Sequence, residues 1–92
     1  MAENVSFQIA GVSGIFECFL LENEYDGELT GTAYYGLRLT KTDGSGLVET
    51  VELSDISVIR RDVETIRDLI VNGGVTPVHF YDIVSDWITA KY

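Results

Sequence analysis

The stretch TAYYGLRLTKTDGSGLVETVEL, from Thr32 to Leu53, decides the fold. In its first part, apolar residues recur at every second position. The odd positions 33–39 are apolar and define one face, whereas the even positions carry residues of different polarity. The segment Asp43-Gly44-Ser45-Gly46 then supplies residues that tolerate the positive φ of a tight turn. Leu47 to Leu53 runs back as a second alternating strand. The pattern predicts an antiparallel β-hairpin.

Two further strands are expected on the N-terminal side of this hairpin. Val5 to Ile9 alternates like a half-buried strand. Ile15 to Glu22 is apolar on both faces, with Ile15, Phe19 and Leu21 on one and Phe16, Cys18 and Leu20 on the other. A strand of this kind is either central and covered on both sides, or has one face covered by another molecule.

After Ser57 the apolar residues recur with the spacing of a helix rather than that of a strand. Asp62 is the expected N-cap of a first helix, and Gly73 is expected to end it in the left-handed conformation. Thr76 and Pro77 have the residue types of an N-cap and a first helical position. An amphipathic stripe follows at Phe80, Ile83, Val84, Trp87 and Ile88.

These elements predict an α+β fold. We expect a four-stranded, mainly antiparallel sheet in the order β-β-β-β-α-α, with both C-terminal helices on one face, in a single domain over residues 1–92. If the helices cover only one face of the sheet, the strand 15–22 keeps apolar side chains exposed on the other face. Such exposed apolar surface favours an interface with another molecule, most simply a second copy in a homodimer. The expected interaction surface consists of Phe16, Leu20, Tyr34, Tyr81 and Trp87.

The charge balance excludes several classes of partner. Fifteen acidic and six basic residues give a net charge of −9, and the only adjacent bases are Arg60 and Arg61. Direct binding to nucleic acid needs a basic patch, and anionic membranes disfavour an acidic protein. The N-terminus lacks the basic and apolar regions of a signal peptide, and no apolar run approaches the ~20 residues that span a bilayer. We therefore expect a cytoplasmic protein.

Three sets of residues could carry chemistry, and each has a simpler interpretation that we favour. Cys18 and His79, the only cysteine and the only histidine, could form a nucleophile and base, but Cys18 lies among large apolar residues typical of a core. Arg60 and Arg61 could receive a phosphate or a carboxylate, but equally balance the nearby acids.

The third set consists of two separate acidic clusters, each a candidate metal site. Glu22, Glu24, Asp26 and Gly27 match the start of a calcium loop, but its twelfth position is Ala33 rather than a glutamate. His79, Asp82 and Asp86 share one side of the second helix, where a lone histidine without a second motif makes a poor metal site. We expect a solvated loop and a solvated helix face, with no metal.

The last two-thirds of the chain resembles an uncharacterised family of short Firmicutes proteins, a domain of unknown function. The resemblance is carried by Tyr35-Gly36-Leu37-Arg38-Leu39, by Asp55-Ile56-Ser57 and by the stretch from Pro77 to Trp87. It implies a small cytoplasmic bacterial protein and supplies no activity and no site residues.

No catalytic constellation, phosphate loop or zinc pattern is present in the sequence. We therefore expect a non-enzymatic protein-interaction or regulatory module without a cofactor. Two alternatives stay open: an acidic mimic of nucleic acid that inhibits a DNA- or RNA-binding protein, and a small-molecule-binding domain with a pocket between sheet and helices.

Overall fold

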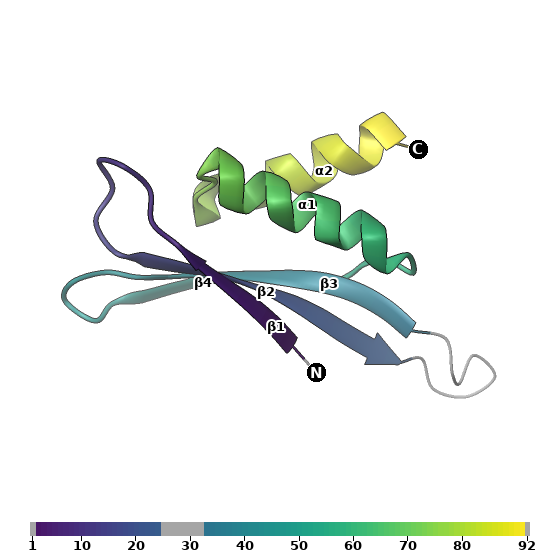
Figure 1. Cartoon of the computed structure of the whole chain (residues 1–92), viewed down its shortest axis with the longest axis horizontal. Helices are drawn as coiled ribbons and strands as arrows, with labels where there is room; N and C mark the ends of the chain where they lie inside the picture. The colour runs from purple at the N-terminus through teal and green to yellow at the C-terminus, as the bar shows by residue number, and fades with distance from the viewer. Residues whose placement is uncertain (1, 25–32, 92) are drawn as a thin grey trace.

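A computed structural model describes residues 2–24 and 33–91 (Figure 1). Four strands come first, and two helices separated by a short 3₁₀ turn follow. The elements are β1 (Ala2–Phe7), β2 (Ile15–Glu24), β3 (Ala33–Thr42), β4 (Val48–Ser57), α1 (Arg60–Gly73), η2 (Pro77–His79) and α2 (Phe80–Lys91). The strands pair in sequence order, and every pair is antiparallel. The expected α+β fold is confirmed.

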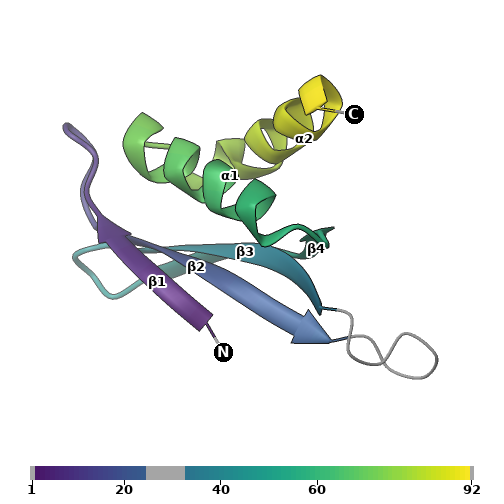
Figure 2. The ribbon, with the colours of Figure 1, turned by 45° about the vertical axis from the view of Figure 1, so that its right-hand side comes forward.

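Both helices pack on the same face of the sheet (Figure 2). On β2 this face carries Phe16, Cys18 and Leu20, which are at most 1% exposed. Leu37 and Leu39 of β3 lie directly opposite Leu20 and Cys18, and they are also fully buried. The helices complete this core with Val63, Ile66, Ile70, Phe80 and Val84. Burial of apolar side chains between the two layers therefore holds the fold together.

The hairpin turn between β3 and β4 is organised by one carboxylate. One oxygen of Asp43 accepts hydrogen bonds from the backbone and the hydroxyl of Ser45 and from the backbone of Leu47. These bonds favour the charged form and lower the pKa of Asp43 below its ordinary value. Gly46 takes the positive φ that the sequence predicted for this turn (88°).

β4 continues to Ser57, four residues beyond the predicted end of the strand, because it contains an irregularity. Leu37 pairs with Leu53, but Tyr35 pairs with Ser57, so the intervening part of β4 has no regular partner. A Cβ atom built on Gly36 would lie only 2.1 Å from the carbonyl oxygen of Leu53. The bulged strand therefore crosses closely over Gly36, and only glycine leaves room for it.

The first helix starts and ends at positions that differ from the prediction. α1 starts at Arg60, Ile59 occupies the N-cap position, and no side chain caps this end of the helix. Asp62 is not the N-cap, because its carboxylate is buried and engaged elsewhere: it accepts from the Ser57 hydroxyl at 3.1 Å and from the Lys91 ammonium at 2.9 Å. At the C-terminal end the left-handed residue is Gly74 (φ 63°), one position later than predicted.

The second helical segment begins as expected at Thr76, which is extended, and Pro77. The first turn is 3₁₀ rather than α, and α2 proper runs from Phe80. Phe80 and Val84 enter the core completely, whereas Ile83, Trp87 and Ile88 are partly buried against it. The predicted stripe is thus the face of α2 that packs on the rest of the molecule.

Candidate interaction surface

The face of the sheet opposite the helices is not covered by any of the described residues (Figures 1 and 2). We call it the open face. Its residues follow from the strand register and form rows across the sheet. The central row crosses all four strands through Asn4, Phe19, Arg38 and Glu52; a second row is Ser6, Glu17, Thr40 and Thr50, and a third contains Ile15, Thr42 and Val48.

Apolar side chains extend along the open face on β2. Ile15 is 52% exposed, and Val48 at the same end of the sheet is 53% exposed. Phe19 and Leu21 are half-buried by their neighbours in the sheet. Leaving large apolar groups in water forgoes roughly 25 cal/mol per Å² of apolar surface, so covering this face would be favourable.

The polar groups of the open face bind one another. Arg38 Nε donates to Glu52 Oε1 at 2.7 Å, and its guanidinium lies 5.8 Å from the centre of the Phe19 ring. Asn4 donates to Glu17 at 2.8 Å. The charged groups of the face are therefore paired across neighbouring strands, and its Ile15 end borders two open depressions of about 250 and 350 Å³.

Two of the predicted surface residues lie in the core. Phe16 and Leu20 face the helices and are 0% and 1% exposed. The strand 15–22 is apolar on both faces, as predicted. The face that the helices leave uncovered, however, is the one that carries Ile15, Phe19 and Leu21. This corrects the assignment of Phe16 and Leu20 to a surface.

The other three predicted residues are accessible to different degrees. Tyr34 pairs with Asn23 and lies on the open face, where it is half-buried. Near it, the Asn23 amide donates to the carbonyl of Ser54 at 3.3 Å, so the bulged part of β4 contacts this end of the face. Tyr81 is 48% exposed on α2, and Trp87 is half-buried beneath the Lys91 ammonium, 5.3 Å from its ring. Neither belongs to the open face.

The choice between the two faces of β2 could not be made from the sequence. It depends on whether even or odd residues of β2 lie opposite the apolar residues of β3, such as Leu37 and Leu39. A shift of one residue in the register exchanges the two faces of a strand. The connection between the two strands, residues 25–32, lies outside the described part of the chain.

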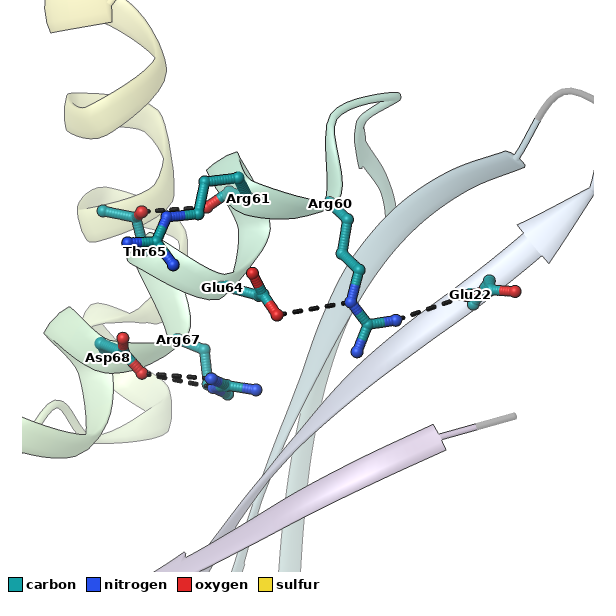
Figure 3. Close-up of polar contacts among 7 residues, drawn as sticks. All are labelled: Glu22, Arg60, Arg61, Glu64, Thr65, Arg67 and Asp68. Carbon is teal, nitrogen blue, oxygen red and sulfur yellow. Dashed lines mark hydrogen bonds and ion pairs between the residues drawn. The ribbon is translucent and has the colours of Figure 1, made fainter.

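Arg60 and Arg61 have separate environments (Figure 3). Arg60 contacts Glu64 at 3.3 Å and reaches from α1 to Glu22 on β2 at 3.4 Å. Arg61 lies on another side of α1, where the Thr65 hydroxyl donates to its backbone carbonyl, and it forms no ion pair within residues 2–24 and 33–91. For Arg60, the expected balance of nearby acids is confirmed.

Arg61 borders a shallow depression of about 520 Å³. Its lining residues are Arg61, Thr65, Asp68, Leu69, Asn72 and Gly73, all of them from α1. Because a single helix lines the depression, no second element encloses a ligand there.

The described residues contain no group of three or more side chains placed to hold a metal ion. His79, Asp82 and Asp86 are exposed on η2 and α2. Of the calcium-loop candidates, Asp26 and Gly27 lie outside the described residues, and Glu22 pairs with Arg60.

Cys18 is fully buried, and desolvation raises the pKa of its thiol to about 12, with a smaller opposing effect of Arg67. The thiol therefore stays protonated at neutral pH, which is the opposite of what a nucleophile needs.

Comparison with known proteins identifies a family but no function. The chain belongs to a family of unknown function, DUF6514, whose model matches residues 8–90. No curated protein and no solved structure matches the chain. Within the described residues, no helix has the length and apolar character needed to cross a membrane.

Proposed function

We propose that this protein is a non-enzymatic interaction module that docks a protein partner on its open face. The observation that carries the proposal is the set of apolar side chains Ile15, Phe19 and Leu21 on β2, interrupted only by Glu17, on a face that no described element covers. Apolar surface in contiguous patches marks interaction sites in soluble proteins.

The chemistry of the described polar groups supports docking over catalysis. Arg38, Arg60 and Lys91 each contact a carboxylate on a neighbouring element of the fold, namely Glu52, Glu22 and Asp62. The buried thiol of Cys18 contributes packing only. We place the protein in the cytoplasm, where a free thiol is stable.

The proposal is tested by photo-crosslinking in the cells that make the protein. A benzophenone amino acid replaces Phe19, where the added ring points out of the open face. The matched control replaces Leu69, an apolar residue of α1 that is 48% exposed on the helical side. We expect a discrete protein adduct from position 19 and none from position 69.

A third position distinguishes the acidic-mimic alternative. Asp86 is exposed on α2. An adduct formed from position 86 and not from position 19 would favour a partner that binds negatively charged surface. It would also refute docking on the open face. Absence of adducts from position 19 would refute it as well.

A further inference from the structure

We infer that the occupant of the open face is a second copy of this chain, packed face to face with the first. This inference rests on the proposed docking function and names its partner. The two copies are related by a two-fold axis that runs parallel to the strands, between β2 and β3.

The distribution of charge favours this face for self-association. The chain carries a net charge of −9, so two copies repel each other over most of their surface. The rows of the open face contain only Glu17, Arg38 and Glu52 as charged residues, a net charge of −1. A basic partner, in contrast, would find little to bind on this face.

The strand order makes the face self-complementary about the proposed axis. Rotation about a line between β2 and β3 places β2 against β3 of the second copy, and β1 against its β4. In the central row, Phe19 then faces Arg38 of the second copy, and Asn4 faces its Glu52. A guanidinium over an aromatic ring and an amide beside a carboxylate are both attractive pairs.

The neighbouring rows also avoid conflict. Glu17 faces Thr40 of the second copy, whose hydroxyl can donate a hydrogen bond, and Ile15 faces Thr42, whose methyl group can pack against it. The other in-plane axis, along the central row, places Arg38 against Arg38 and Glu52 against Glu52. Like charges in direct opposition cost affinity, so the strand-parallel axis is favoured. It also gives the aligned packing found in β-sandwiches.

The size of the face suits a reversible dimer. Three ten-residue strands about 33 Å long, the six-residue β1 and a spacing of about 4.8 Å between strands give roughly 600 Å² per copy. Two copies therefore bury about 1,200 Å², at the lower end of specific interfaces. We expect a dissociation constant in the micromolar range.

The test is sedimentation equilibrium of the purified chain between about 1 μM and about 1 mM, a range that brackets such a constant. The wild-type chain should change from monomer to dimer. Phe19→Lys places a lysine opposite Arg38 of the second copy and should raise the dissociation constant at least about 30-fold, as loss of a central anchor does. Leu69→Lys adds the same charge on the helical side and should leave dimerisation unchanged.

A mixture of two variants tests the axis itself. Arg38→Glu alone should also dimerise weakly. When it is mixed with Phe19→Lys, the new lysine faces the new glutamate, and Arg38 of the lysine variant still faces Phe19 of the other. We therefore expect a heterodimer that forms at lower concentration than either homodimer.

Three results would overturn the inference. They are a wild-type monomer at every concentration, a dimer that survives Phe19→Lys, and a mixture that forms no heterodimer although both variants remain folded by circular dichroism. A wild-type monomer together with a heterologous adduct from position 19 would overturn only this inference and leave the docking function in place.

Discussion

The ammonium group of Lys91 lies 2.9 Å from a carboxylate oxygen of Asp62, a residue only 3% exposed. Lys91 is in the last turn of α2, and Asp62 is in the first turn of α1, so this ion pair joins the C-terminal helix to the start of the first one. Ser57 at the end of β4 donates to the same carboxylate. The three elements therefore meet at one buried charge.

Lys91→Met should destabilise the fold by about 1–2 kcal/mol, because it removes a countercharge from a buried carboxylate while keeping most of the side chain over Trp87. The magnitude is below that of a fully buried pair since the Lys91 side chain is 44% exposed. Urea unfolding measures the loss. In the double variant with Asp62→Asn, the losses of unfolding free energy from the two substitutions should not add. Strict additivity would show that the two residues are not coupled.

Gly36→Ala should be among the most damaging single substitutions. The new methyl group would lie 2.1 Å from the Leu53 carbonyl oxygen and 2.6 Å from Ser54 atoms, all of them backbone. The strand must move to admit it, at a cost of about 1–3 kcal/mol or more. Gly44→Ala is the matched control, because nothing lies within 4 Å of its added Cβ. Equal melting temperatures for the two variants would contradict the close crossing of β4.

The Cys18 thiol should not react with iodoacetamide in the folded protein. It is completely buried, and burial holds its pKa near 12, so the reactive thiolate is absent at neutral pH. Alkylation should begin only when urea unfolds the chain, and mass spectrometry follows it. Rapid labelling of the native protein would place Cys18 outside the core.

Stability should fall as the pH rises above 9. Below that value the thiol is protonated in both states, and its contribution to stability is fully present. Between pH 9.0 and about 12 the unfolded chain releases the Cys18 proton while the folded chain keeps it. Deprotonation therefore stabilises the unfolded state and lowers the free energy of unfolding. Cys18→Ala should show a shallower decline of the unfolding free energy with pH, and identical slopes would refute the raised pKa.

Local patterns were sufficient to predict the hairpin, the second strand and the stripe of α2, whereas β1 runs from Ala2 to Phe7 rather than from Val5 to Ile9. Alternation from Ala33 to Leu39 and the glycines near Asp43 act over a few residues, and the structure confirms both. The start of α1 was misplaced because Asp62 has the residue type of a cap, but contacts distant in sequence, above all with Lys91, bind its carboxylate. Such contacts leave no local signal.

The candidate surface was predictable only in part. The sequence shows that β2 is apolar on both faces, which indicates that one face is in surplus. Deciding between Phe16 and Phe19 requires the register with β3, and Arg38 is recognisable as part of the surface only once its neighbours Phe19 and Glu52 are known. A pattern read along one strand carries no information about the strand beside it.

The most direct test of docking on the open face is a thiol-protection measurement at Ile15, which is 52% exposed at one end of that face. In the variant Ile15→Cys, the new thiol is expected to be the only reactive one, since Cys18 is buried. We predict rapid alkylation in dilute purified protein and strong protection inside the producing cell, whereas Leu69→Cys should be labelled equally in both. Equal labelling of Ile15→Cys in the two settings would contradict the account.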